Sequence, residues 1–179
     1  MTLEKEEIIE IVENAISWIV VLAMLLYGVG KFFQFDGAAQ INKTVAQMTG
    51  MELMWAFYGY SKPFALTIGF LEVTGGILIF FKKTRIIGCL LTSTVLVNVI
   101  LQDIFYGVNV GALKAAVIYQ TLIIIILWFN RSQLIEAFKI LVTHEKRTES
   151  TRRWGIKLAI AFVLFVVVRI LEYLITVKT

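Results

Sequence analysis

The chain has 179 residues, of which 59% are hydrophobic and only 17% charged, with a net charge of +4 at pH 7. Soluble domains carry about 25% charged residues, so this composition excludes an ordinary soluble enzyme and predicts an integral membrane protein. A single cysteine, Cys89, excludes an internal disulfide and a CxxC redox centre. The single histidine, His144, lies in a charged segment and cannot form a metal site without other ligands. We therefore expect no catalytic residues, no metal site and no nucleic-acid partner.

Five apolar segments approach the roughly 20 residues that a helix needs to cross about 30 Å of hydrocarbon. The fourth is short and could extend over residues 108–111. The sequence predicts an all-α integral membrane protein, with a four-helix transmembrane bundle followed by a fifth, C-terminal transmembrane helix. In chain order, the five segments are residues 8–33, 64–81, 86–106, 113–129 and 156–177.

This pattern divides the chain into three parts. Residues 1–130 form the four-helix bundle, residues 131–155 a basic cytoplasmic linker or surface helix, and residues 156–179 the fifth transmembrane helix. Between the first two spans, residues 34–62 are rich in aromatic side chains and contain no long polar run. This link favours a short helix in the membrane interface, and Pro63 is well placed to open the next span.

Basic residues predict the orientation in the membrane. KKTR at residues 82–85 and HEKRTESTRRWGIK at residues 144–157 are both rich in lysine and arginine. The positive-inside rule places both in the cytoplasm, which puts the N-terminus inside and the C-terminus outside. The acidic start, MTLEKEEIIEIVEN, is unlike a secretory signal, so we expect the first apolar segment to be retained.

One acid interrupts the second span. Glu72 is the only charge within residues 64–81 and lies near the predicted midplane. The predicted topology places several other polar residues of the spans beside it or in the outer half of the bilayer. We predict an outward-facing polar pocket with Glu72 at its floor and with these candidate partners: Lys31, Asn98, Asp103, Gln120, Arg169 and Glu172.

An isolated charge at the bilayer centre costs about 2.5–3.5 kcal/mol on insertion scales, so Glu72 must be neutral, hydrated or paired. Lys31 or Arg169 could supply an ion pair, and Asn98 or Gln120 a hydrogen bond. The alternative role is purely structural, since buried polar residues also hold helices together without any ligand.

The other charges also have simpler roles. Lys31 lies near a span end, where a lysine can extend its ammonium group to the interface. Arg169 and Glu172 form an i,i+3 pair that can neutralise itself. Asp103 has no cation one turn away on its own helix, so we expect its partner to come from another span.

The segments LYGVGKFFQF, FYGYSKPFALTIGFLEVTGGILIFFKKTRIIGCLL and VNVILQDIFYGV resemble the DoxX-like membrane proteins. The resemblance covers residues 15–130 and implies a compact four-helix membrane bundle, most often in a bacterial inner membrane. Two features depart from the family: Asn14 lies where many members have an arginine, and residues 131–179 extend beyond the four-helix unit. The family includes subunits of a thiosulfate:quinone oxidoreductase, proteins linked to redox stress and the receptor chaperone NACHO.

Three functions remain open. The first is a non-enzymatic accessory protein, a subunit or assembly factor, that binds another membrane protein, a second copy of itself or a lipophilic ligand such as a lipid. The second is a quinone-linked redox subunit, although the sequence has no evident cofactor site and quinone is only a candidate. The third is a small oligomeric channel or transporter.

Overall fold

The computed structural model describes residues 4–142 and 151–177, and every regular element in these ranges is a helix. The chain forms two compact units, residues 1–138 and 139–179. Among the described residues, five helices are long and apolar enough to cross a membrane, which confirms the predicted all-α integral membrane protein. They are α1 (Lys5–Gly30), α3 (Lys62–Phe80), α4 (Arg85–Tyr106), α5 (Val110–Phe129) and α7 (Thr151–Val177).

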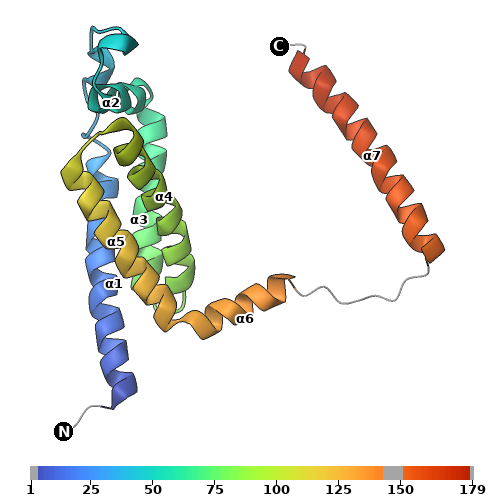
Figure 1. Cartoon of the computed structure of the whole chain (residues 1–179), viewed down its shortest axis with the longest axis horizontal. Coiled ribbons are helices and arrows are strands. Elements are labelled where there is room, and N and C mark those ends of the chain that lie inside the picture. The colour runs from blue at the N-terminus through green and yellow to red at the C-terminus, as the bar shows by residue number, and fades with distance from the viewer. Residues whose placement is uncertain (1–3, 143–150, 178–179) are drawn as a thin grey trace. The chain divides into compact units, whose positions relative to one another are not determined.

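The first unit is a four-helix bundle in which each helix packs against two neighbours. α1 contacts α3, α3 contacts α4, α4 contacts α5, and α5 returns to α1 (Figure 1). The outer faces of these helices expose many large apolar side chains, as expected where the solvent is lipid. The completely buried side chains at the centre are Ser17, Val20, Met24, Ile79, Cys89, Thr92, Ile123 and Ile126.

Local sequence sets the helix boundaries. Pro63 lies in the first turn of α3, as predicted, where its missing N–H costs nothing. Gly107 has a left-handed backbone (φ +60°) and ends α4, a conformation that most other residues adopt only with strain. The Asn109 side chain then accepts a hydrogen bond of 2.9 Å from the Ala112 amide and starts α5. The fourth span therefore takes in part of the segment 108–111.

The link between the first two spans contains the predicted short helix. This helix, α2 (Gly50–Tyr60), follows two 3₁₀ turns, η1 (Ala38–Gln40) and η2 (Val45–Gln47). α2 contacts α3 and α4 and lies across the end of the bundle at which α1 ends (Figure 1). Gly50 has no room for a Cβ atom against the backbone of Tyr106, so the start of α2 abuts the end of α4.

Two helices follow the bundle. α6 (Arg131–Val142) starts directly after Asn130, which ends α5. α7 begins at Thr151, five residues before the predicted start of the fifth span. His144 lies outside the described residues. In α7, Arg169 and Glu172 are hydrogen-bonded to each other, which is the predicted i,i+3 pair.

Candidate functional site

A close crossing of α1 and α3 positions the first two site residues. A Cβ atom added at Gly28 would lie 2.6 Å from the carbonyl oxygen of Gly69, and one added at Gly69 would lie 2.6 Å from that of Gly28. Glycine at both positions lets the two backbones touch, as small residues do between membrane helices. A Cβ at Gly69 would also lie 3.0 Å from the Lys31 side chain. The crossing therefore holds Lys31 alongside α3.

Lys31 and Glu72 form an ion pair inside the bundle. The Lys31 Nζ lies 3.5 Å from the Glu72 Oε2, and the side chains are 12% and 3% exposed. The Nζ also donates a hydrogen bond of 3.1 Å to Gln34 Oε1 and lies 5.8 Å from the ring centroid of Phe35. Glu72 Oε2 is buried without a hydrogen-bond partner among the described residues, so its contact with Lys31 is electrostatic.

A cavity of about 280 Å³ lies beside this pair, between α2 and the ends of α1, α4 and α5. A smaller hollow of about 110 Å³ is lined by Glu72 and shares the side chains of Lys31, Gln34, Val99 and Ala112 with the large one. Much of the wall of the large cavity is apolar and comes from the link between the first two spans: Phe35, Met51, Met54, Trp55 and Tyr58.

The aromatic rings of this wall pack on one another. The rings of Phe35 and Tyr58 are stacked with centroids 4.9 Å apart, and Trp55 meets Phe35 edge-on at 5.6 Å. The Tyr58 hydroxyl also donates a hydrogen bond of 3.0 Å to Gln102 Oε1, which ties α2 to α4. These contacts fix the shape of the wall.

The start of α2 is held by polar contacts outside the spans. Thr49 and Glu52 form a capping box, in which the Thr49 Oγ1 accepts a hydrogen bond of 3.2 Å from the Glu52 amide. Hydrogen bonds to the Glu52 carboxylate, first from Lys43 and then from the Thr49 amide, lower the pKa of Glu52 to about 2. The helix that supplies the cavity wall therefore has a fixed first turn.

Asp103 places an acid in the lining of the large cavity, as Glu72 does in the smaller hollow. Its side chain lines the cavity and the residue is 7% exposed. The Oδ2 atom is buried and has no hydrogen-bond partner in the described part of the chain. Within the bundle, over residues 4–138, no ion pair involves Asp103, so the expected cation does not come from another helix of the bundle.

The remaining predicted site residues lie elsewhere. Asn98 is exposed on α4 and accepts a hydrogen bond from Gln102 Nε2. Gln120 Nε2 donates a hydrogen bond of 2.7 Å to Ser93 Oγ, joining α5 to α4 away from the cavity lining. Arg169 and Glu172 belong to the second unit, where they pair with each other and are exposed. Of the seven predicted residues, the structure brings Lys31, Glu72 and Asp103 to the two hollows.

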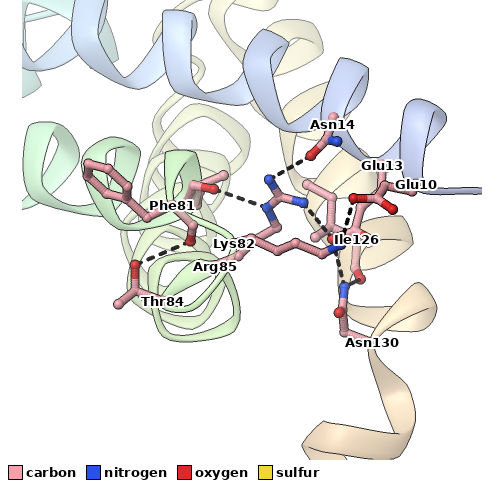
Figure 2. A network of polar contacts seen from close by, with 10 residues as sticks. Glu10, Glu13, Asn14, Phe81, Lys82, Thr84, Arg85, Ile126 and Asn130 are labelled. Atoms are coloured by element: carbon pink, nitrogen blue, oxygen red, sulfur yellow. Dashed lines mark hydrogen bonds and ion pairs between the residues drawn. The ribbon is translucent and has the colours of Figure 1, made fainter.

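A second polar cluster lies at the opposite end of the bundle. Arg85, at the start of α4, donates hydrogen bonds to Glu13 Oε1 at 2.7 Å, to Asn14 Oδ1 at 2.9 Å and to the Ile79 carbonyl at 3.1 Å. Asn130 Nδ2 donates to the same Glu13 oxygen at 3.0 Å, from the end of α5. Figure 2 shows the guanidinium group between α1 and the turn that joins α3 to α4.

The sequence argument missed this cluster because it treated Arg85 as one of the loop cations that set the orientation. Both ends of its ion pair are buried, with Arg85 4% and Glu13 9% exposed. The neighbouring pair of Lys82 with Glu10, by contrast, is exposed. Asn14, noted only as a departure from the DoxX-like pattern, receives one of the arginine's hydrogen bonds. The sequence did contain a signal for this cluster. Arg85 directly precedes an apolar run, and Glu13 is next to another polar residue, Asn14, at the start of the first span.

These features define a multi-pass α-helical membrane protein whose bundle carries a polar cavity at one end and a buried ion-pair cluster at the other. The chain belongs to the MauE family: the family model described as "Methylamine utilisation protein MauE" matches residues 9–115, more than half of the chain. The match includes Lys31, Glu72 and Asp103 as well as Glu13 and Arg85. The predicted multi-pass membrane family is confirmed at this level, whereas the closer resemblance to DoxX-like proteins stays a prediction.

Among curated proteins, the chain is similar to "Uncharacterized protein YwoB" of Bacillus subtilis (strain 168), with 29% identity over 90 residues. The aligned region covers 50% of this chain and 57% of the relative, so the chain spans less than two thirds of that protein's length. No solved structure gives a significant match.

Proposed function

We propose that this chain is a non-enzymatic accessory protein of the membrane, a subunit or assembly factor, that holds the polar head of a lipophilic ligand in its outer cavity. One observation carries the proposal. Asp103 lines the large cavity together with its aromatic wall, and Glu72 lines the adjoining smaller hollow; each carboxylate has a buried oxygen without a hydrogen-bond donor among the described residues. Clefts that combine an apolar lining with a few convergent polar groups are typical ligand sites.

The energetic argument concerns these two oxygens. A buried acceptor without a partner costs about 1–3 kcal/mol, and more when it is charged. A ligand that brings hydrogen-bond donors to the cavity recovers this cost, whereas a purely apolar ligand does not. The preferred ligand is therefore amphipathic, with its polar group inside.

The size of the cavity agrees with this view. About 280 Å³ is at the lower end of the range of roughly 300–1,000 Å³ for small-molecule sites. Such a volume takes a head group or a single ring, and longer apolar chains would lie along the exposed apolar faces of the bundle.

An accessory role suits the chain better than catalysis on its own. The sequence offers no recognisable catalytic motif, and its single histidine and single cysteine give little material for nucleophilic catalysis. The family description links MauE to methylamine utilisation. We extend that link to this chain only as an accessory contribution, made with another membrane protein or with a second copy of itself.

A quinone is the second candidate ligand, and the aromatic wall favours it. A quinone ring could pack against Trp55, which lines the cavity, and its carbonyl groups could accept hydrogen bonds from Lys31. This alternative makes the chain a quinone-linked redox subunit, with the redox partner on another protein.

The test is to identify what the purified protein retains. The full chain, extracted in mild detergent and analysed by native mass spectrometry, should carry a lipid or quinone whose mass identifies it. Ala112 lines both hollows, so Ala112→Trp should fill them and release the ligand. Val117→Trp is the matched control, since it adds the same side chain to the same helix at an exposed position that lines neither hollow.

Loss of the ligand in Ala112→Trp alone supports the proposal, and a bound quinone favours the redox subunit. A parent protein that carries neither lipid nor quinone, and takes up neither on titration, contradicts both functions.

The orientation is part of the same proposal, because the cavity must open outward. We place the N-terminus in the cytoplasm and the C-terminus outside, in a bacterial inner membrane. Cys89 is completely buried and therefore protected from a labelling reagent. Labelling then reports on a cysteine that is introduced into a loop. An impermeant maleimide applied to intact cells should label Lys43→Cys and should label Lys83→Cys only after lysis. The reverse pattern would contradict the orientation.

A further inference from the structure

We propose that the outer cavity binds a protonated primary amine, with Asp103 as its counter-ion and the rings of Phe35, Trp55 and Tyr58 beside it. This inference rests on the proposed function, because it names the chemistry of the ligand for the same cavity. Three independent observations carry it: the balance of charges, the missing hydrogen-bond donor and the aromatic wall.

The balance of charges leaves one acid unmatched. Of the charged side chains that line the two hollows, Lys31 is the only cation, and it lies 3.5 Å from Glu72. Asp103 is the second acid, and within the bundle, over residues 4–138, no residue forms an ion pair with it. A buried carboxylate with no counter-ion is strongly unfavourable, so an ionised Asp103 calls for one positive charge from a ligand.

The hydrogen-bond pattern narrows the kind of cation. The Oδ2 of Asp103 is buried and receives no hydrogen bond in the described part of the chain. A primary ammonium group supplies both the missing charge and up to three N–H donors. A quaternary ammonium group supplies the charge without a donor, and a hydroxyl group supplies a donor without the charge.

The aromatic wall can stabilise the same group. Cations are attracted to the faces of aromatic rings within about 6 Å of the ring centroid. The Lys31 Nζ already lies 5.8 Å from the Phe35 centroid, so this wall accepts an ammonium group in the structure itself. Tyr58 is stacked between Phe35 and Phe64, whereas Trp55 lines the same cavity as Asp103 and offers further ring surface for a second ammonium group.

An ammonium group of this kind has two sources in a membrane. One is the head group of an aminophospholipid such as phosphatidylethanolamine, whose acyl chains remain in the bilayer. The other is a small free alkylamine such as methylammonium. The cavity volume admits either one.

The experiment compares lipids and amines that differ at the nitrogen. The full chain is placed in nanodiscs of phosphatidylcholine with a minor share of either phosphatidylethanolamine or phosphatidylglycerol, and the lipids that remain bound are counted by native mass spectrometry. In parallel, methylammonium and tetramethylammonium chloride are titrated by calorimetry. Phosphatidylcholine and tetramethylammonium carry the charge without N–H donors, so they serve as chemical controls.

Three variants accompany the parent. Asp103→Asn removes the charge at nearly constant shape, and Asp103→Glu keeps it. Glu10→Gln is the matched control, because it removes one negative charge from an exposed position at the opposite end of the bundle, outside the lining of both hollows.

We expect the primary amine to be favoured over its quaternary counterpart by about tenfold or more, since a charge-assisted hydrogen bond is worth about that factor. Asp103→Asn should abolish the preference, whereas Glu10→Gln should retain it and Asp103→Glu should retain most of it. Preferential retention of phosphatidylethanolamine alone assigns the head group, and binding of methylammonium alone assigns the free amine.

Equal binding of primary and quaternary amines, or an unchanged preference in Asp103→Asn, overturns the inference. Its failure is distinct from failure of the proposed function. If the cavity retains phosphatidylglycerol or a quinone and Ala112→Trp releases it, the cavity still holds a lipophilic ligand and only the amine assignment is wrong.

Discussion

Replacing Arg85 by methionine should destabilise the four-helix bundle severely. The guanidinium group satisfies a carboxylate, a side-chain amide oxygen and a backbone carbonyl at once, through Glu13, Asn14 and Ile79. Methionine has a similar length but no charge and no donors. The variant leaves the Glu13 carboxylate buried, with the Asn130 amide as its remaining hydrogen-bond donor.

The size of the effect follows from burial. The two side chains of the pair are only 4% and 9% exposed, and removing one partner of a buried pair costs about 3–5 kcal/mol. Glu13→Gln combined with Arg85→Met removes both charges, so the double variant should be more stable than Arg85→Met alone. Lys82→Met is the matched control, because Lys82 pairs with Glu10 at an exposed position and such pairs contribute about 0–1 kcal/mol.

The measurement is reversible unfolding of the full chain in mixed micelles of dodecyl maltoside and SDS, followed by circular dichroism and tryptophan fluorescence. Arg85→Met should shift the midpoint to much lower SDS, and Lys82→Met should hardly move it. If Arg85→Met falls within about 1 kcal/mol of the parent, or if the effects of Glu13→Gln and Arg85→Met simply add, the argument from an uncompensated buried charge is refuted.

Two further predictions concern the other end of the bundle. Gly69→Val should destabilise the bundle by about 1–3 kcal/mol or more, because the Cβ atom of the new valine would lie 2.6 Å from the carbonyl oxygen of Gly28 in α1. An unfolding midpoint equal to that of the parent would contradict the close crossing of α1 and α3. The Glu52 carboxyl should titrate near pH 2 in a carbon-13 NMR experiment, and Lys43→Met should move the midpoint up toward 4.5. Because the pKa is lower in the folded protein, its contribution to stability is present above pH 4.5 and is lost as pH falls toward 2, so a parent midpoint near 4.5 would contradict the hydrogen bonding.

Most helix boundaries could be predicted from the sequence because two strong signals coincide there. Apolar runs of spanning length end at charged or glycine-containing turns, and Pro63 begins a helix in water or in lipid alike. The short helix in the link between the first two spans was also predictable, because that link is rich in aromatic residues. Its contacts with α3 and α4 were not, because they depend on how the bundle ends pack.

The polar residues show where reasoning from one sequence stops. Lys31 was one of two cations considered for Glu72, and the structure places it within 3.5 Å. Depth along a span, however, does not reveal the direction in which a side chain points: Asn98 lies one turn from Gln102, yet it is exposed. The cluster around Arg85 joins residues 72 and 117 positions apart along the chain. No local pattern encodes such a meeting.

The Arg85–Glu13 pair also imposes an order on biosynthesis. α1 enters the membrane carrying Glu13 and Lys31, and both must wait for partners that are translated later, on α3 and α4. Since an unpaired charge in the hydrocarbon is costly, α1 reaches its most stable position only after the α3–α4 hairpin has supplied Glu72 and Arg85. Packing of the α3–α4 hairpin against the first helix therefore pairs the charges near both of its ends, Glu13 with Arg85 and Lys31 with Glu72.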